Sequence, residues 1–298
     1  MRNKNKIKSS TGEKIFNCFN LVFMIGMIIV MFYPMWHVLC ASFSDARELS
    51  MHTGILLHPE GFSTTAYKLM LKNPMVFKGY ANTLFILIFG VIINVFMTCI
   101  AAYVLSRKNV MLNKPITILI IFTMYFSGGL IPTYMNVMQL GLENSLWAVI
   151  LPGAINTYNM IVLRTAFASV PESLEESAKI DGASNFRIMW QIILPLSRAT
   201  VAVICLYYAV AHWNSWFNAM LYLKDRNKFP LQLILREILI QNDTSSMVSA
   251  NVGAGDSSFV SETVKYAIII VSTVPILCVY PFIQKYFAKG VMVGAVKG

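Results

Sequence analysis

Long apolar segments recur along the whole chain, and each is about as long as a membrane-spanning helix. The hydrocarbon core of a bilayer needs roughly 20 apolar residues per helix, because each helical residue rises about 1.5 Å and lipid tolerates no unpaired backbone groups. Six segments meet this requirement, near residues 15–41, 79–106, 114–137, 145–168, 196–223 and 264–288. We therefore predict an all-α integral membrane protein with six transmembrane helices.

The composition excludes an ordinary soluble domain. The mean hydropathy is +0.61, and 56% of the residues are hydrophobic while 13% are charged. The net charge of +10 would suit a nucleic-acid partner. However, the basic residues are dispersed at the ends of the apolar segments, without a dense stripe or an aromatic platform for base stacking. We therefore expect contact with anionic membrane lipid and no nucleic-acid partner.

Lysine and arginine residues near the segment ends predict the orientation, because cytoplasmic loops carry an excess of both. Such residues precede the first segment and fill the loop after the second, namely Arg2, Lys4, Lys6, Lys8, Lys14, Arg107, Lys108 and Lys114. The loop at 138–144 has none, although the longer outside loops at 42–78 and 224–262 also carry some. With six crossings, we predict that both termini are cytoplasmic.

Residue types that carry chemistry are scattered. The five cysteines and four histidines stand singly, without the spacing of a metal site or a disulfide framework. His212, inside the fifth segment, is compatible with a proton relay or with a hydrogen-bonded or interfacial histidine. The chain has no phosphate-binding loop and no H-E-x-x-H motif. We expect no catalytic residue, metal or cofactor in this chain, so any energy from ATP must come through another subunit.

The polar stretch between the fourth and fifth segments predicts a short helix. Ser169 and Glu172 have the spacing of a capping box, and Pro171 is acceptable in a first helical turn. Glu175 and Lys179 then form a favourable pair one turn apart. The helix is therefore expected to begin near residue 169.

A turn and a second helix are predicted to follow. Asp181 and Gly182 can end the first helix, and Ser184 can cap an amphipathic helix over 185–193. Pro195 is predicted to break this helix before the fifth segment. From spacing alone, the result is either a helix-turn-helix ledge that docks a partner or an amphipathic connector that lies in the lipid headgroups.

The same stretch resembles a known loop. From Glu176 to Pro195 the chain reads E-S-A-K-I-D-G, then nine residues, then I-I-L-P. It resembles the EAA loop of bacterial ATP-binding cassette importer permeases, whose pattern is E-A-A-x-x-x-G and, after the same interval, I-x-L-P. The matching positions are Glu176, Ala178, Gly182, Ile192, Leu194 and Pro195, while Ser177 replaces the first alanine.

The likeness extends over nearly the whole chain. F-S-G-G-L-I-P-T-Y from Phe126, W-N at Trp213 and G-A-V-K-G from Gly294 are similar to carbohydrate-importer permeases of the MalG type. The first of these sequences is similar to a branch associated with complex plant-derived oligosaccharides. The resemblance implies a cytoplasmic segment at 1–14, a first helix and external loop at 15–78, a permease core at 79–288 with the EAA loop at 169–195, and a cytoplasmic tail at 289–298.

The resemblance also implies partners and a location. A multi-pass permease of this type lies in the bacterial cytoplasmic membrane and pairs with a second, MalF-like permease. Two ATPase subunits, which bind ATP and Mg, sit beneath the EAA loops, and an extracellular solute-binding lipoprotein delivers the sugar. The residues implied to couple this chain to the ATPase are Glu175, Glu176, Ser177, Ala178, Asp181, Gly182, Ile192, Leu194 and Pro195. Glu176 would contact the ATPase surface, and Gly182 would allow close backbone approach.

Polar and aromatic residues inside the segments are candidates for the translocation path, because sugars need hydrogen bonds and aromatic faces. They are Asn82, Asn94, Asn156, Asn159, Trp213, Asn214, Trp216 and Asn218. Each also has a structural interpretation, as a tie between helices or a member of an interfacial aromatic belt. In addition, the companion permease could contribute most of the substrate site.

Some features leave further alternatives open. Pro132, Pro152 and Pro275 are either static kinks or points about which gates move. The Ser-, Asn- and Gly-rich stretch 242–258 suits contact with a binding protein or a mobile linker. An ATP-independent secondary transporter or channel is a second function class, but it would need coupling charges, and the apolar segments contain no Asp or Glu. A membrane enzyme would need a convergent catalytic motif that the loops lack.

Overall fold

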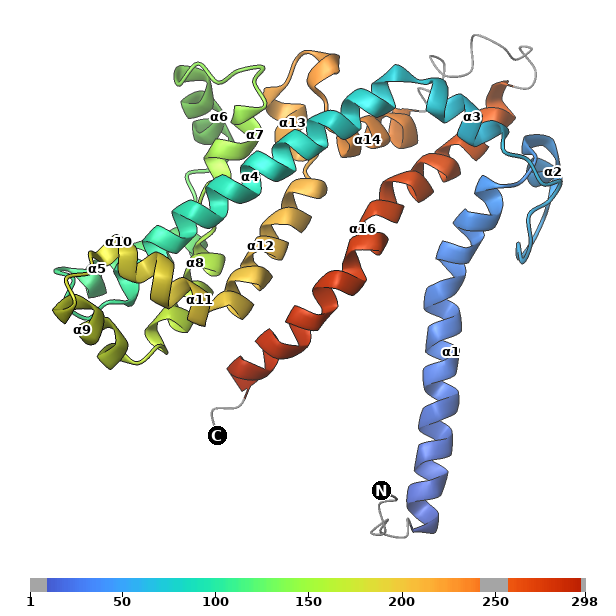
Figure 1. Ribbon diagram of the computed structural model, residues 1–298. Coiled ribbons are helices and arrows are strands. Elements are labelled where there is room, and N and C mark those ends of the chain that lie inside the picture. Colours follow the sequence, from blue (N-terminus) through green and yellow to red (C-terminus); the bar gives the residue numbers. More distant parts are fainter. Residues whose placement is uncertain (1–9, 242–256, 296–298) are drawn as a thin grey trace. The chain divides into compact units, whose positions relative to one another are not determined.

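The computed structural model describes residues 10–241 and 257–295, and every regular element within them is a helix (Figure 1). The all-helical prediction is therefore confirmed for these residues. Residues 1–9, most of the predicted linker at 242–258 and the end of the chain from 296 lie outside the described residues. The described residues divide into two compact units, one running to Lys72 and including Ser257–Val271, the other beginning at Asn73 and including residues 272–295.

The first unit is built on α1, Thr11–Ser42, which confirms the first predicted segment as one helix. Ser10 caps it by accepting the Glu13 N–H at 3.2 Å. Most of its apolar side chains are exposed, as expected of a helix that faces lipid. Only its last residues are buried, where Cys40 and Ala41 pack with Leu56. The short helices α2, Ala46–Met51, and α3, Thr65–Lys72, follow.

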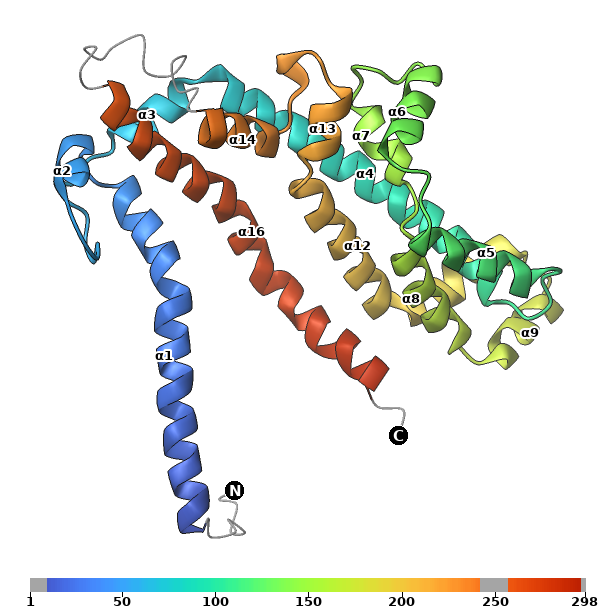
Figure 2. The same ribbon diagram turned by 180° about the vertical axis from the view of Figure 1, so that it is seen from behind.

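The second unit is arranged around α4, Pro74–Ser106, which contains the second predicted segment. This helix packs against α8, Thr157–Ala168, against α12, Arg198–Trp213, and against α14, Leu231–Gln241 (Figures 1 and 2). Its buried positions recur every three or four residues and so form one stripe: Thr83, Ile86, Gly90, Asn94 and Thr98. The main core cluster of this unit surrounds Leu163, Phe167, Ile188 and Ile204.

The prediction of one helix over 114–137 is wrong. Two helices occupy this range, α5, Asn113–Tyr125, and α6, Leu130–Gln139, and they meet at an angle of 112°. Gly129, between them, has φ +91°, a value that side chains other than glycine rarely adopt and that a helix cannot contain. Apolar character continues through this break, so hydropathy alone did not indicate it.

The fourth and fifth predicted segments are also interrupted. Within 145–168 lie α7, Trp147–Ile150, the 3₁₀ turn η1, Leu151–Gly153, and then α8. The fifth prediction, 196–223, covers α12 and a separate α13, Phe217–Tyr222. Asn214 ends α12, since its Nδ2 donates to the Val210 carbonyl at 2.9 Å and satisfies a group of the last turn. Neither range is the single helix that was predicted.

Three helices among the described residues are long and apolar enough to cross a bilayer alone: Thr11–Ser42, Pro74–Ser106, and Glu262–Val279 within α16, Ser257–Ala295. The number rises to five if each of two bent helix pairs is one span. Pro275 lies inside α16 without interrupting it. The number of six spans and the cytoplasmic location of both termini stay predictions.

Gly79 lets α4 approach α14 closely. A Cβ atom there would lie 2.6 Å from Ile234 Cδ1 and 3.2 Å from Leu231 Cα. Gly79→Val should therefore lower the free energy of unfolding by about 1–3 kcal/mol through overpacking. Thermal unfolding in detergent would measure this, with Gly26→Val in α1 as the control, because a Cβ there meets nothing within 4 Å. Equal effects of the two variants would contradict the close packing.

Candidate functional site

The loop between α8 and α12 folds into the predicted pair of helices. Its elements are α9, Glu172–Ile180, then α10, Asn185–Ile188, the π-helical turn η2, Met189–Ile193, and α11, Leu194–Leu196. The predicted capping box is wrong, because Ser169 still has helical dihedral angles at the end of α8 and donates to the Ala166 carbonyl at 2.7 Å. Pro171 stands at the N-cap of α9 instead.

The turn at Asp181 and Gly182 is confirmed. Gly182 has φ +79°, and its N–H donates to the Lys179 carbonyl at 3.0 Å. The next N–H, from Ala183, donates to the Ala178 carbonyl at 2.9 Å. These two bonds form a Schellman motif, in which a left-handed residue reverses the chain and satisfies the last helical carbonyls. The left-handed backbone conformation favours glycine here.

The second helix begins as predicted but ends later. Ser184 caps it by accepting the Arg187 N–H at 3.4 Å. Pro195 does not break it, because the wider π turn before it lets the Leu194 N–H reach back to the Met189 carbonyl. The chain instead bends by 89° at Ser197, between Asn185–Leu196 and α12. The predicted break at Pro195 is therefore wrong by a short distance along the chain.

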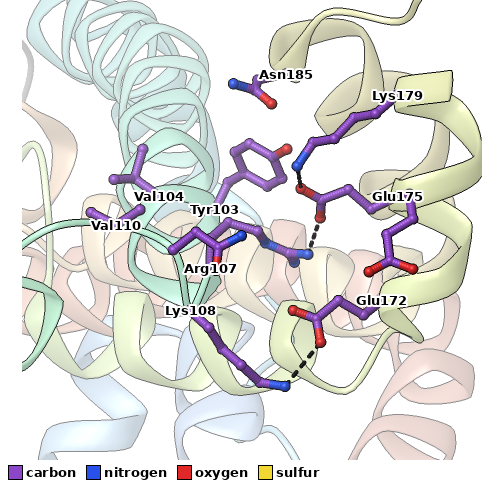
Figure 3. A pocket seen from close by; sticks show the side chains of 11 residues that line it. Tyr103, Val104, Arg107, Lys108, Val110, Glu172, Glu175, Lys179 and Asn185 are labelled. Atoms are coloured by element: carbon purple, nitrogen blue, oxygen red, sulfur yellow. Dashed lines mark hydrogen bonds and ion pairs between the residues drawn. The ribbon is translucent and has the colours of Figure 1, made fainter.

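A buried ion pair fastens α9 to the end of α4. Arg107 follows the last residue of α4, and its Nη1 donates to Glu175 Oε2 (Figure 3). Its Nη2 donates to the Phe167 carbonyl at 3.0 Å, and its guanidinium lies over the Tyr103 ring at 5.0 Å from the centroid. Glu175 is 5% exposed, and its other oxygen accepts from Lys179 at 2.9 Å. The predicted Glu175–Lys179 pair is confirmed, and Arg107, Glu175 and Lys179 are called the clamp below.

A second ion pair between the same elements is exposed. Lys108 Nζ lies 2.9 Å from Glu172 Oε2, and the two side chains are 80% and 52% exposed. The Lys108 hydrogen bond holds the pKa of Glu172 below its usual range. A lowered folded-state pKa stabilises the fold in full only above the ordinary carboxyl pKa. The contribution of this pair therefore declines as the pH falls below that value, and it is lost as the pH falls through the lowered pKa. Both pairs line one pocket of about 310 Å³.

The structure separates the predicted coupling residues by exposure. Those on the outer surface of the loop are Glu176, Ser177, Asp181, Gly182 and Pro195, whereas Ala178, Ile192 and Leu194 are half-buried against the core and Glu175 is buried. Two residues of interest were missed. Arg107 was interpreted only as a topology signal, and Ile180, beside the turn, is 86% exposed although apolar. The position of Ile180 directly before an Asp-Gly turn could have indicated that this apolar side chain is exposed.

Four of the predicted path residues come together in a cavity of about 440 Å³: Asn94, Asn156, Asn159 and Asn218. His212 lines the same cavity and is buried, and its Nε2 makes no hydrogen bond within the described residues. The other four predicted residues lie elsewhere and have local contacts. Asn82 donates to the Asn227 and Phe229 carbonyls, Trp213 is buried beside Tyr80, Asn214 ends α12, and Trp216 lies under Arg236.

Comparison with known proteins gives a consistent set of matches. Residues 84–293 match the family described as binding-protein-dependent transport system inner membrane component. The chain is 41% identical to the polygalacturonan/rhamnogalacturonan transport system permease protein YtcP of Bacillus subtilis (strain 168), across 96% of this chain and 99% of that protein. It is 39% identical to Protein LplC of the same organism, across 97% of each.

A solved structure is similar as well. It is described as the crystal structure of a bacterial ABC transporter involved in the import of the acidic polysaccharide alginate. One chain of it superimposes with a TM-score of 0.86 at 31% sequence identity. The match covers 95% of this chain and 100% of that chain, so the two share a fold along their whole length.

Proposed function

We infer, because this chain belongs to the family of binding-protein-dependent transport system inner membrane components, that it is a permease subunit of an ATP-binding cassette importer for oligosaccharides. The resemblance found in the EAA loop is thereby confirmed at the level of the family. The observation that carries this function is the near full-length likeness to YtcP, a protein named for polygalacturonan and rhamnogalacturonan transport. We propose an oligosaccharide of that type as the substrate.

The proposed assembly has four kinds of partner. This chain pairs with a second, MalF-like permease, two ATPase subunits bind ATP and Mg beneath the EAA loops, an extracellular solute-binding lipoprotein supplies sugar, and membrane lipid surrounds the helices. The name of the matched family, which specifies dependence on a binding protein, supports the third partner. The proposed location is the bacterial cytoplasmic membrane, crossed six times with both termini in the cytoplasm.

The proposed organisation keeps the permease core at 79–288, with the EAA loop at 169–195. The cytoplasmic segments are 1–14 and 289–298, and residues 15–78 form the first helix and an external loop. In this arrangement the exposed residues Glu176, Asp181 and Gly182 face the ATPase. Their exposure in the single chain supports this role, because a docking surface must be free before the partner binds.

The clamp explains how movement at the loop reaches the membrane. Arg107 belongs to the end of α4, whereas Glu175 and Lys179 belong to α9. Closure of the ATPase dimer displaces α9, and the buried ion pair makes the end of α4 move with it. The helices packed on α4 then change between two arrangements, one open to each side of the membrane. Glu175 therefore acts inside the permease and not on the ATPase surface.

Co-purification tests this function. The chain, tagged at its native locus and extracted in mild detergent, should bring down a second permease, an ATPase and a solute-binding lipoprotein, identified by mass spectrometry. The purified complex should hydrolyse ATP, and reconstituted vesicles should take up oligosaccharide only with ATP. Recovery of the chain alone, under conditions that keep a reference importer intact, would favour the ATP-independent transporter or channel.

A further inference from the structure

A polar cavity lies within the second unit, among helices that are otherwise apolar. Its wall comes from α4, α7, η1, the beginning of α8, α12 and α13. Asn94 lies on α4, thirteen residues before Arg107, the C-cap of that helix, and this separation corresponds to about 20 Å along the helix axis. Because a hydrocarbon core is about 30 Å thick, the cavity lies about two-thirds of the way across it if the clamp is at the cytoplasmic surface. Its volume of about 440 Å³ is typical of ligand pockets.

Most residues that line this cavity carry a polar side-chain group, and none of them is charged. Apart from Val149, Gly153 and Ala211, every lining residue has an amide, a hydroxyl or an imidazole. None of them is Lys, Arg, Asp or Glu. Polar side chains inside a membrane bundle are costly unless they are hydrogen-bonded, so such a concentration needs an explanation.

Part of the lining holds the wall together. Tyr208 Oη is within 2.7 Å of Thr98 Oγ1 and accepts the Asn156 N–H at 2.9 Å. Asn94 Nδ2 donates to the Gly153 carbonyl at 3.2 Å, and this bond joins α4 to η1. The Nδ2 of Asn94 therefore ties two elements together, which is the structural role that the sequence also allowed.

Other groups of the lining are left without partners in the described residues. Asn94 Oδ1 accepts no hydrogen bond from the described residues, and this residue is 2% exposed. His212 Nε2 also has no partner among them, but a Cβ at Gly90 would lie 2.5 Å from it, so this nitrogen faces α4 and not the cavity. The side-chain amide of Asn159 makes no hydrogen bond to another described residue either, and this residue is 6% exposed. Some polar groups of the lining hydrogen-bond one another, and others have no protein partner within the described residues. Such unpaired groups can bind a ligand that carries many hydroxyls.

We propose that this cavity is a sugar subsite supplied by this chain itself, in which amides of Asn159, Asn218 and Asn94 hydrogen-bond hydroxyl groups of the transported oligosaccharide. This inference rests on the proposed function. Tyr158 supplies a ring against which a sugar face packs. The site recognises hydroxyls and not carboxylates, because a carboxylate would call for Lys or Arg, which the lining lacks. Any charge on the substrate is met outside this cavity.

Sugar-dependent ATP hydrolysis by the whole importer in nanodiscs tests the subsite. The probes are oligosaccharides from partially hydrolysed polygalacturonan and rhamnogalacturonan, as free acids and as methyl esters. Asn159→Leu should raise the KM about 3- to 10-fold, the loss of one hydrogen bond. The ratio of the variant KM to the wild-type KM should be the same for the free acids and the methyl esters, because the carboxyl groups lie outside the site. Asn136→Leu, the same change on the exposed surface of α6, is the control.

Several outcomes would overturn the subsite. One is an unchanged KM in the Asn159→Leu variant, and another is a rise in KM that is confined to the free acids. The third is a complex that hydrolyses ATP but whose hydrolysis is stimulated by neither form of the probe. If Asn159→Leu does not assemble, Asn218→Leu replaces it, because Asn218 lines the same cavity but is exposed. Failure of the proposed function would look different: the wild-type chain would recover no ATPase subunit and show no ATP-dependent uptake.

Discussion

Arg107→Ala is expected to abolish ATP-driven uptake and to lower the free energy of unfolding by about 3 kcal/mol, the lower end of the cost of removing one partner of a buried ion pair. Glu175 would stay in a site where it is 5% exposed, with Lys179 as its remaining ionic partner. The Phe167 carbonyl would also lose its Arg107 donor. Denaturation in detergent and vesicle uptake, measured on the same preparation, would give both effects.

The neighbouring exposed pair supplies the control for this prediction. Lys108→Ala removes a cation next in sequence that bridges to the same helix, but both partners of that pair are largely exposed. Water replaces the lost contact, so stability and uptake should change little. Glu175→Gln should fall between the two variants, because an amide retains a hydrogen bond to Arg107 without the charge. Equal losses in the Arg107 and Lys108 variants would contradict the importance of burial.

Local sequence patterns predicted the EAA loop well at positions where the structure depends on contacts within a single turn. Asp181 and Gly182 end α9 because the bonds involved join residues a few positions apart. Ser169 was misassigned for a related reason. Its spacing to Glu172 fits a capping box, but Ser169 is the C-cap of α8, with helical dihedral angles and its side chain donating to the carbonyl of Ala166 in the preceding turn. A capping pattern is thus ambiguous wherever one helix ends just before another begins.

Features that depend on distant contacts could not be predicted. Arg107 and Glu175 are 68 positions apart, and nothing in their local sequence indicates that they meet. The amides of the cavity were identifiable by residue type, but α4, the beginning of α8 and α13 must come together before four of them converge. The broken segment 114–137 shows the same limit, since hydropathy measures how apolar a run is and not its direction.

Gly182→Trp is expected to abolish uptake and transport-coupled ATP hydrolysis while the chain still folds and inserts. A Cβ at this position meets nothing within 4 Å, so the single chain has room for a large side chain. The φ of +79° adds a backbone cost of about 1–2 kcal/mol for a residue other than glycine. The large effect should therefore arise only when the ATPase approaches the loop. The amount of ATPase recovered with the tagged permease, together with uptake, measures it.

Gly141→Trp separates the backbone cost from the docking defect. Gly141 has φ +67° and also has open space around its Cβ position, but it lies between α6 and α7 and not in the coupling loop. The two tryptophan variants have similar backbone strain, and only Gly182→Trp places bulk on the loop that is proposed to dock the ATPase. Gly182→Asn should be nearly normal, because asparagine tolerates the left-handed conformation and is small. Normal ATPase recovery and coupling in Gly182→Trp would show that the ATPase does not approach the chain at this turn.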